Sequence, residues 1–145
     1  MVNFPFFRHN PQGFTEYIEM PNPDRGFEVE AFNILLLYGM SAIQAKAVLA
    51  HELMHVWLAD NGIIDIDDAL CEGSCDYASY MFLKDVGSAQ SNYIIRIMRE
   101  DLDPVYGRGF RDVERYVGTN GVAAWLHMLH EEARRAPSSY AIQSD

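Results

Sequence analysis

The sequence has few cysteines, few basic residues and no long hydrophobic run, and each shortage excludes a class of protein. Its two cysteines, Cys71 and Cys75, lie four positions apart in a predicted helix, which argues against a disulfide framework and favours a reducing, cytoplasmic location. The 11 basic residues face 21 acidic ones, giving a net charge of −10. We therefore expect neither nucleic acid nor an anionic membrane surface as a partner.

No segment has the length of a membrane span or the order of a secretion signal. The longest apolar run, residues 31–40, is interrupted by Asn33. The first residues lack a basic stretch followed by a long apolar one. With 145 residues, of which 49% are hydrophobic, the chain is predicted to form one globular domain with a substantial core.

Turn residues and capping patterns divide the chain into a short β region and five helices. Residues 1–27, rich in Pro, Gly and aromatics, predict an irregular segment with at most one short strand near 14–20, before a strand over 28–38. Ser41 and Gln44 form a capping-box pattern for a helix that ends at Asn61-Gly62. Further helices are predicted over 69–84, 91–102, from a glycine-rich turn at 106–110 to 118, and over 122–136. The domain is expected to cover 28–136, followed by a frayed tail at 137–145.

The stretch AVLAHELMHVWLADNG places three polar residues, His51, Glu52 and His55, in an otherwise apolar helix. Burying two imidazoles and a carboxylate is costly unless each finds a partner. In a helix, His51 and His55 share one face about one turn apart, so both rings can bind one cation while Glu52 flanks it. This His-Glu-x-x-His arrangement is typical of zinc hydrolases, in which the glutamate takes a proton from zinc-bound water.

A second stretch, CEGSCDYASY, offers the third ligand that a catalytic zinc site needs. Glu72 follows His55 by 17 residues, which leaves room for a turn and an antiparallel return. Asp76 lies one helical turn beyond Glu72 and can accept the free ring N–H of a ligating histidine. The combined pattern is that of the gluzincins. It predicts one Zn²⁺ bound by His51, His55 and Glu72, with Glu52 as general base.

Two other interpretations remain open for these residues. Hydrogen-bonded histidines beside a salt-bridged glutamate would give the same five-residue pattern without a metal. Cys71 and Cys75 could join a closed structural site, but their spacing is not C-x-x-C and such a site would leave Glu52 without a role. Buried structural thiols explain the two cysteines better.

The group that stabilises the oxyanion is less clearly marked. His127 and His130 lie three apart on the last predicted helix; one of them could reach the cleft, but either alone is better explained as a partly exposed helix residue. Tyr106, beside glycines, competes for this role, or it is a turn aromatic packed on the core. Tyr106 and His127 are taken as the candidates, whereas Tyr80 is interpreted as core.

Taken together, these segments resemble the peptidase domain of the plant ubiquitin-activated organ-size regulators, which are LIM-domain-associated, DA-one-like gluzincin metallopeptidases. The resemblance covers residues 25–130 and is carried by the zinc motif, by CEGSCDYASYMFL and by DPVYGRGFRDVERYV, of which Tyr106–Arg111 is the most specific part. It implies an α+β zincin with a small sheet over the zinc helix. It also implies that His51, His55 and Glu72 are ligands and that Glu52 is the catalytic base.

The sequence departs from the family pattern in three ways. It lacks the ubiquitin-interacting and LIM modules and the long insert after the second helix, so it resembles a stand-alone domain. Asp76 stands where Gln is expected in the plant members, and the family's last-helix histidine falls on neither His127 nor His130. We predict a zinc endopeptidase acting on a protein or peptide, with ubiquitin or a ubiquitin-like protein as a partner. The alternative is a zinc-binding module that recognises such a partner without cutting it.

Overall fold

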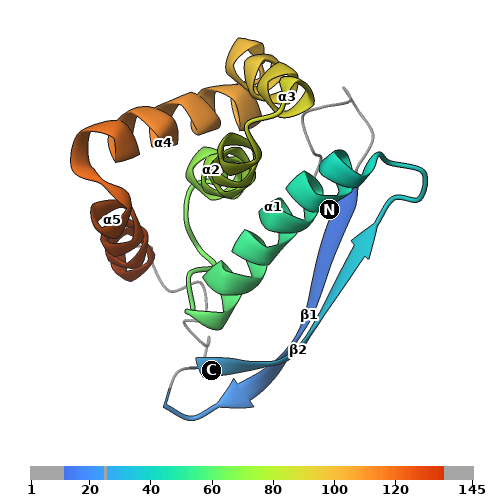
Figure 1. Cartoon of the computed structure of the whole chain (residues 1–145). Coiled ribbons are helices and arrows are strands. Elements are labelled where there is room, and N and C mark those ends of the chain that lie inside the picture. Colours follow the sequence, from blue (N-terminus) through green and yellow to red (C-terminus); the bar gives the residue numbers. More distant parts are fainter. Residues whose placement is uncertain (1–11, 25, 136–145) are drawn as a thin grey trace.

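A two-stranded antiparallel sheet precedes five helices in the computed structural model, which describes residues 12–24 and 26–135 (Figure 1). Strand β1 (Gly13–Asn22) pairs with β2 (Gly26–Leu36), and a register shift follows Ile18. The short strand expected near 14–20 is confirmed and is longer than expected, since β1 takes up residues 13–22 of the segment expected to be mostly irregular. These residues are held as a strand by long-range pairing with β2, whereas residues 1–11 lie outside the described part.

Capping residues mark the ends of the first two helices close to their predicted boundaries. Helix α1 (Ala42–Asp60) begins at the Ser41–Gln44 capping box, and Gly62 after it has a φ of 70°. The Asp67 carboxylate accepts two backbone N–H groups at the start of α2 (Asp68–Val86), which ends at the left-handed Gly87. The remaining helices are α3 (Ala89–Glu100), α4 (Tyr106–Asn120) and α5 (Val122–Arg135). The expected tail at 137–145 lies outside the described residues.

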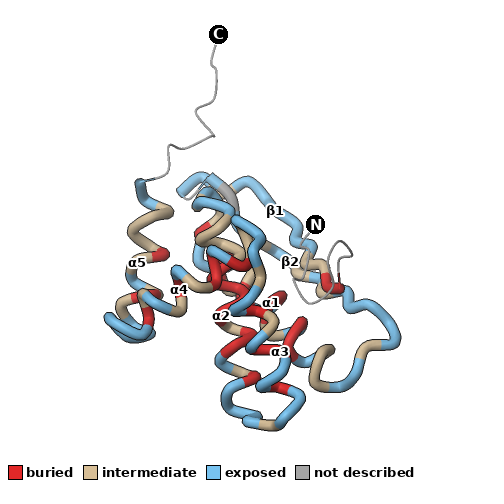
Figure 2. Tube along the Cα trace, turned by 90° about the horizontal axis from the view of Figure 1, so that it is seen from above, coloured by how far each residue is buried: buried red, intermediate tan, exposed pale blue. Residues whose placement is uncertain are grey.

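Helix α2 occupies the centre of the domain. It packs against α1, α3 and α4, while the β1–β2 ribbon lies along the other side of α1 (Figure 1). Buried positions concentrate on α1 and α2 (Figure 2). The largest fully buried apolar side chains in the described chain are Trp125, Phe110, Leu83, Met98 and Leu129. Burial of this apolar surface is the main force holding the helices together.

The segment Tyr106–Phe110 is the first part of helix α4, which corrects the expected glycine-rich turn. Its glycines are required by packing. A methyl group at Gly109 would overlap the backbone of Ala69, and one at Gly73 would overlap the backbone of Gly109. Helices α2 and α4 therefore touch backbone to backbone beside Glu72. A local sequence pattern cannot distinguish this use of glycine from its use in turns.

Within residues 12–24 and 26–135, none of the helices combines the length and the hydropathy of a membrane span.

Candidate metal centre

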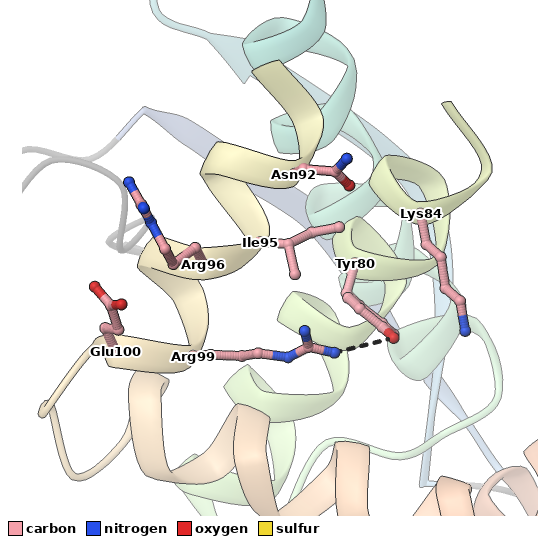
Figure 3. A pocket seen from close by; sticks show the side chains of 7 residues that line it. All are labelled: Tyr80, Lys84, Asn92, Ile95, Arg96, Arg99 and Glu100. Atoms are coloured by element: carbon pink, nitrogen blue, oxygen red, sulfur yellow. Dashed lines mark hydrogen bonds between the residues drawn. The ribbon is translucent and has the colours of Figure 1, made fainter. Parts of the chain in front are cut away.

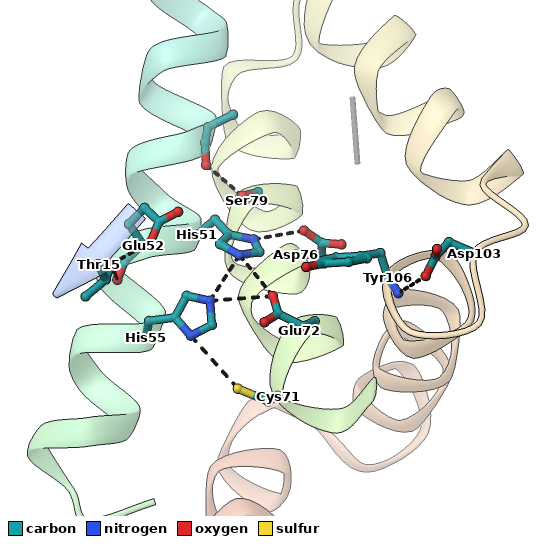
Figure 4. A network of polar contacts seen from close by, with 11 residues as sticks. Thr15, His51, Glu52, His55, Cys71, Glu72, Asp76, Ser79, Asp103 and Tyr106 are labelled. Carbon is teal, nitrogen blue, oxygen red and sulfur yellow. Dashed lines mark hydrogen bonds and ion pairs between the residues drawn. The ribbon is translucent and has the colours of Figure 1, made fainter. Parts of the chain in front are cut away.

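Three candidate ligand atoms from α1 and α2 lie close together (Figure 4). His51 Nε2 lies 3.2 Å from His55 Nε2, and Glu72 Oε2 lies 3.3 Å from the first and 3.5 Å from the second. Two ligands of a tetrahedral zinc ion, each about 2.0–2.1 Å from the metal, are about 3.3 Å apart. The one-turn spacing of the two histidines and the antiparallel return of α2 thus produce a triangle of the correct size for one cation.

The far nitrogen of each histidine ring contacts a residue of α2. Asp76 Oδ1 lies 2.9 Å from His51 Nδ1, and Cys71 Sγ lies 3.9 Å from His55 Nδ1. Such contacts fix ring orientation and leave Nε2 for the metal. The contact with Asp76 was expected. The contact with Cys71 was not expected. The one signal for it in the sequence is that Cys71 directly precedes Glu72.

The charges of the cluster depend strongly on its neighbours. Burial opposes protonation of His51, but its contacts with Asp76 and Glu72 outweigh burial and raise the pKa of His51 to about 9. Burial likewise opposes protonation of His55, and the contacts with Cys71 and Glu72 raise its pKa to about 10. Burial would raise the pKa of Glu72, but the two histidines lower it to about 2. The surroundings of the two imidazoles therefore favour positive charge at this point. A divalent cation could take the place of the imidazole protons.

Buried oxygen atoms without a hydrogen-bond partner occur in this cluster and on the ribbon side of α1. Among the described residues, the buried side-chain oxygens without a hydrogen-bond partner include Glu72 Oε2, Asp76 Oδ2 and Glu52 Oε1. Glu72 Oε2 approaches both histidines, yet neither contact has the geometry of a hydrogen bond. Leaving a buried acceptor unpaired costs about 1–3 kcal/mol. An oxygen in this position fits a bound cation better than an empty core.

Cys75 is a competing third donor. Ligand atoms of His51, His55 and Cys75 all lie within 4.8 Å of one another, as do those of His55, Cys71 and Glu72. Burial raises the pKa of the Cys75 thiol, which disfavours the thiolate form that binds metals. The structure thus holds a candidate metal site built on His51 and His55, with Glu72 or Cys75 beside them.

Glu52 leaves α1 on the side that faces the β ribbon rather than α2 (Figure 4). It is fully buried, and the Thr15 hydroxyl donates a hydrogen bond of 2.5 Å to its Oε2. Sequence reasoning placed Thr15 in a possible short strand near 14–20 but missed its contact with Glu52, because the two residues are 37 positions apart. The β propensity of the residues from Phe14 to Ile18 was a weak signal for the strand.

The two candidate oxyanion donors have different surroundings. Figure 4 shows the Tyr106 ring pointing from the start of α4 toward Asp76 and Glu72. Its backbone N–H is capped by Asp103 at 2.9 Å. The His127 side chain is 74% exposed on α5, with Glu131 4.0 Å away. The contacts described for His127 thus give no support for a place at the cluster, whereas Tyr106 is directed toward it.

The rest of the Tyr106–Arg111 segment anchors α4. The Phe110 ring is buried with its centroid 5.7 Å from that of Tyr80, which confirms Tyr80 as core. The Arg111 guanidinium donates hydrogen bonds to the carbonyl oxygens of Arg99 and Asp101 at the end of α3. The segment therefore holds the start of α4, and with it Tyr106, against α2.

A separate cavity of about 530 Å³ lies between α2 and α3 (Figure 3). It is lined by Tyr80, Lys84, Asn92, Ile95, Arg96, Arg99 and Glu100. None of the cluster residues lines it.

Comparison with known proteins identifies the relatives of the chain. The family model described as DA1-like, Protein DA1, matches residues 13–96, which is more than half of the chain. Arabidopsis thaliana Protein DA1-related 2 is 46% identical over 55 residues, covering 38% of this chain and 10% of the relative. Protein DA1-related 7 of the same plant is 30% identical over 128 residues, covering 67% and 22%.

Protein DA1 itself, also from Arabidopsis thaliana, is 26% identical over 135 residues, covering 74% of this chain and 25% of the relative. The chain thus spans a quarter or less of the length of these three relatives. No solved structure matches it significantly. The family match includes both helices of the candidate centre and the strand that covers Glu52, and on this evidence the chain belongs to the DA1-like family.

Proposed function

We propose that the chain is a zinc-dependent endopeptidase of the gluzincin type. One observation carries this proposal: His51 Nε2, His55 Nε2 and Glu72 Oε2 lie 3.2–3.5 Å from one another, and Glu52 follows His51 directly in helix α1. Membership of the DA1-like family supports it, since the resemblance to that peptidase domain implies the same ligands.

His51, His55 and Glu72 would hold the ion, and Cys75 would remain a buried thiol. When bound, zinc supplies a Lewis acid that polarises the scissile carbonyl and acidifies water. Asp76 and Cys71 hold the two imidazole rings with Nε2 near Glu72 Oε2, where the ion would bind. Nitrogen and carboxylate donors with one position left for water are typical of catalytic zinc.

Glu52 acts as the general base. Its carboxylate takes the proton of the attacking water as the water oxygen bonds to the carbonyl carbon, and it then gives the proton to the leaving amine as the C–N bond breaks. Tyr106, directed toward the same cluster, would donate a hydrogen bond to the developing oxyanion. The substrate is a protein or peptide, and ubiquitin or a ubiquitin-like protein is a partner suggested by the family resemblance.

The decisive experiment compares Glu52→Gln with the parent chain after loading with zinc. The variant should bind one zinc ion and cleave a casein substrate at less than about one hundredth of the parent rate, the contribution expected of a general base. Glu100→Gln, an exposed position on α3, is the control and should keep full activity. Full cleavage by chelator-treated, zinc-reloaded Glu52→Gln would contradict the mechanism.

The same preparation can decide whether Glu72 or Cys75 is the third ligand. Glu72→Gln should lose zinc on dialysis, whereas Cys75→Ser should retain it. The reverse result would assign the third position to Cys75 and leave Glu72 outside the ion's shell.

A second candidate function, a zinc-binding module that recognises a ubiquitin-like or other protein without cutting it, is favoured by exposed apolar residues. The end of β2 and the residues after it expose Leu35 by 55%, Leu37 by 52% and Tyr38 by 100%, and α1 exposes Leu53 by 51%. Exposed apolar side chains of this kind suit a protein partner or a substrate. A zinc-loaded parent chain that binds but never cleaves a protein would favour this function.

The free thiols of Cys71 and Cys75 support a reducing, cytoplasmic location for either proposed function.

A further inference from the structure

Strand β1 contributes two residues that contact the carboxylate of Glu52. The Thr15 hydroxyl donates a hydrogen bond of 2.5 Å to Oε2 and also lies 3.4 Å from the Glu52 backbone carbonyl. Gly13 lies two positions earlier, on the same face of the strand. A methyl group at Gly13 would be only 2.5 Å from Glu52 Oε1. The Glu52 side chain of α1 therefore packs into the space above Gly13 on β1, next to Thr15, which is 37 residues away in the sequence.

Burial makes this contact decisive for the direction of Glu52. The side chain is 0% exposed, and among the described residues Thr15 is the one hydrogen-bond donor to its carboxylate, while Oε1 has no hydrogen-bond partner. In a buried site of low dielectric, a single short hydrogen bond to a carboxylate strongly restricts its rotation. The oxygen that Thr15 does not hold is the one left to accept a proton.

We propose that Thr15 is a positioning residue for Glu52 and that Gly13 provides the space for the second carboxylate oxygen. This inference rests on the proposed function, because it assigns to β1 the task of directing the general base. Thr15 holds Oε2, and Oε1 receives the proton of the attacking water and returns it to the leaving amine. The ribbon thus takes part in the reaction through Glu52, in addition to covering α1.

The first test measures the contact itself in metal-free protein, without reference to activity. Thr15→Val removes the hydroxyl and keeps the shape of the side chain, so it should lower the melting temperature by about 4 °C. Thr15→Ser should change it much less. In a Glu52→Ala background the Val substitution should have little effect. The control is Thr119→Val, which removes a hydroxyl that donates to the Arg115 carbonyl at 3.1 Å, on α4.

The second test measures kinetics at equal zinc content. Thr15→Val should lower kcat about tenfold or more with KM within about twofold, because a misdirected base loses part of its contribution. Thr15→Ser should restore most of kcat. Gly13→Ala should also lower kcat, since its methyl group would displace Oε1.

Two results would overturn the assignment of Thr15. One is a parental kcat in Thr15→Val when Glu52→Gln is inactive. The other is an equal loss of melting temperature with and without the Glu52 carboxylate. An inactive zinc-loaded parent chain would instead overturn the proposed function, and the thermal comparison would then still decide whether Thr15 holds Glu52.

Discussion

Asp76 Oδ1 lies 2.9 Å from Nδ1 of His51, and both side chains are at most 1% exposed. The pair joins α1 to α2 inside the core and fixes the imidazole with Nε2 toward His55 and Glu72. Because Asp76 Oδ2 has no hydrogen-bond partner in the described chain, the hydrogen bond to His51 is the contact that this buried carboxylate depends on. A buried polar pair of this kind, in which one carboxylate oxygen has no second partner, is sensitive to small changes in either residue.

Asp76→Asn is expected to weaken zinc binding about 10- to 100-fold, because the amide supports the His51 ring less strongly than the carboxylate. Competition with a chromophoric chelator measures the affinity. Asp85→Asn is the matched control, an exposed position near the end of the same helix. Equal affinities of the Asp76→Asn variant and the parent protein would show that Asp76 has no part in holding the metal.

The metal-free protein should lose stability as the pH rises above neutrality. The folded-state pKa values of His51 and His55, about 9 and about 10, lie above the usual 6.5. Their contacts therefore stabilise the fold fully below pH 6.5, and this contribution is lost as the pH rises through 9 to 10. Each histidine contributes at most about 1.4 kcal/mol per pH unit to the free energy of unfolding.

Urea unfolding between pH 6 and 10 measures this slope. Zinc-loaded protein is the control, because the metal requires neutral imidazoles and removes the proton difference. A metal-free stability that is constant over this range would contradict the raised pKa values.

Gly109→Ala should destabilise the protein by about 1–3 kcal/mol, since a methyl group there would overlap the backbone of Ala69 on α2. The same helix offers a control at Gly118, where an added methyl group meets nothing within 4 Å. Gly118→Ala should be neutral or should stabilise by up to about 1 kcal/mol. Chemical denaturation of both variants checks the difference, and equal stabilities would argue against close packing of α2 and α4.

Tyr106→Phe should lower kcat at least tenfold, if the phenol stabilises the oxyanion as such donors do. His127→Ala should leave kcat unchanged, because the histidine is exposed and its described contact is with Glu131. Steady-state kinetics on one peptide substrate compares the two. Loss of activity in the His127 variant alone would reverse the assignment.

The sequence by itself determined the features that depend on neighbours along the chain. The capping box at Ser41, the left-handed ends at Gly62 and Gly87, and the one-turn spacing of His51 and His55 all follow from helix geometry. The spacing to Glu72 also predicted correctly that α2 would return beside α1, because a short turn leaves two helices antiparallel neighbours. The candidate ligands were therefore within reach of sequence reasoning.

Only the tertiary structure decided what covers these residues. That β1 is a full strand, that Thr15 meets Glu52, and that Gly73 and Gly109 bring two helices into backbone contact depend on residues far apart in the chain. A glycine in a turn and a glycine at a close contact between two helices look the same in a sequence. A strand flanked by Pro and Gly gains its stability from its partner strand rather than from its own residues. Packing between elements, which local patterns do not encode, selected these arrangements.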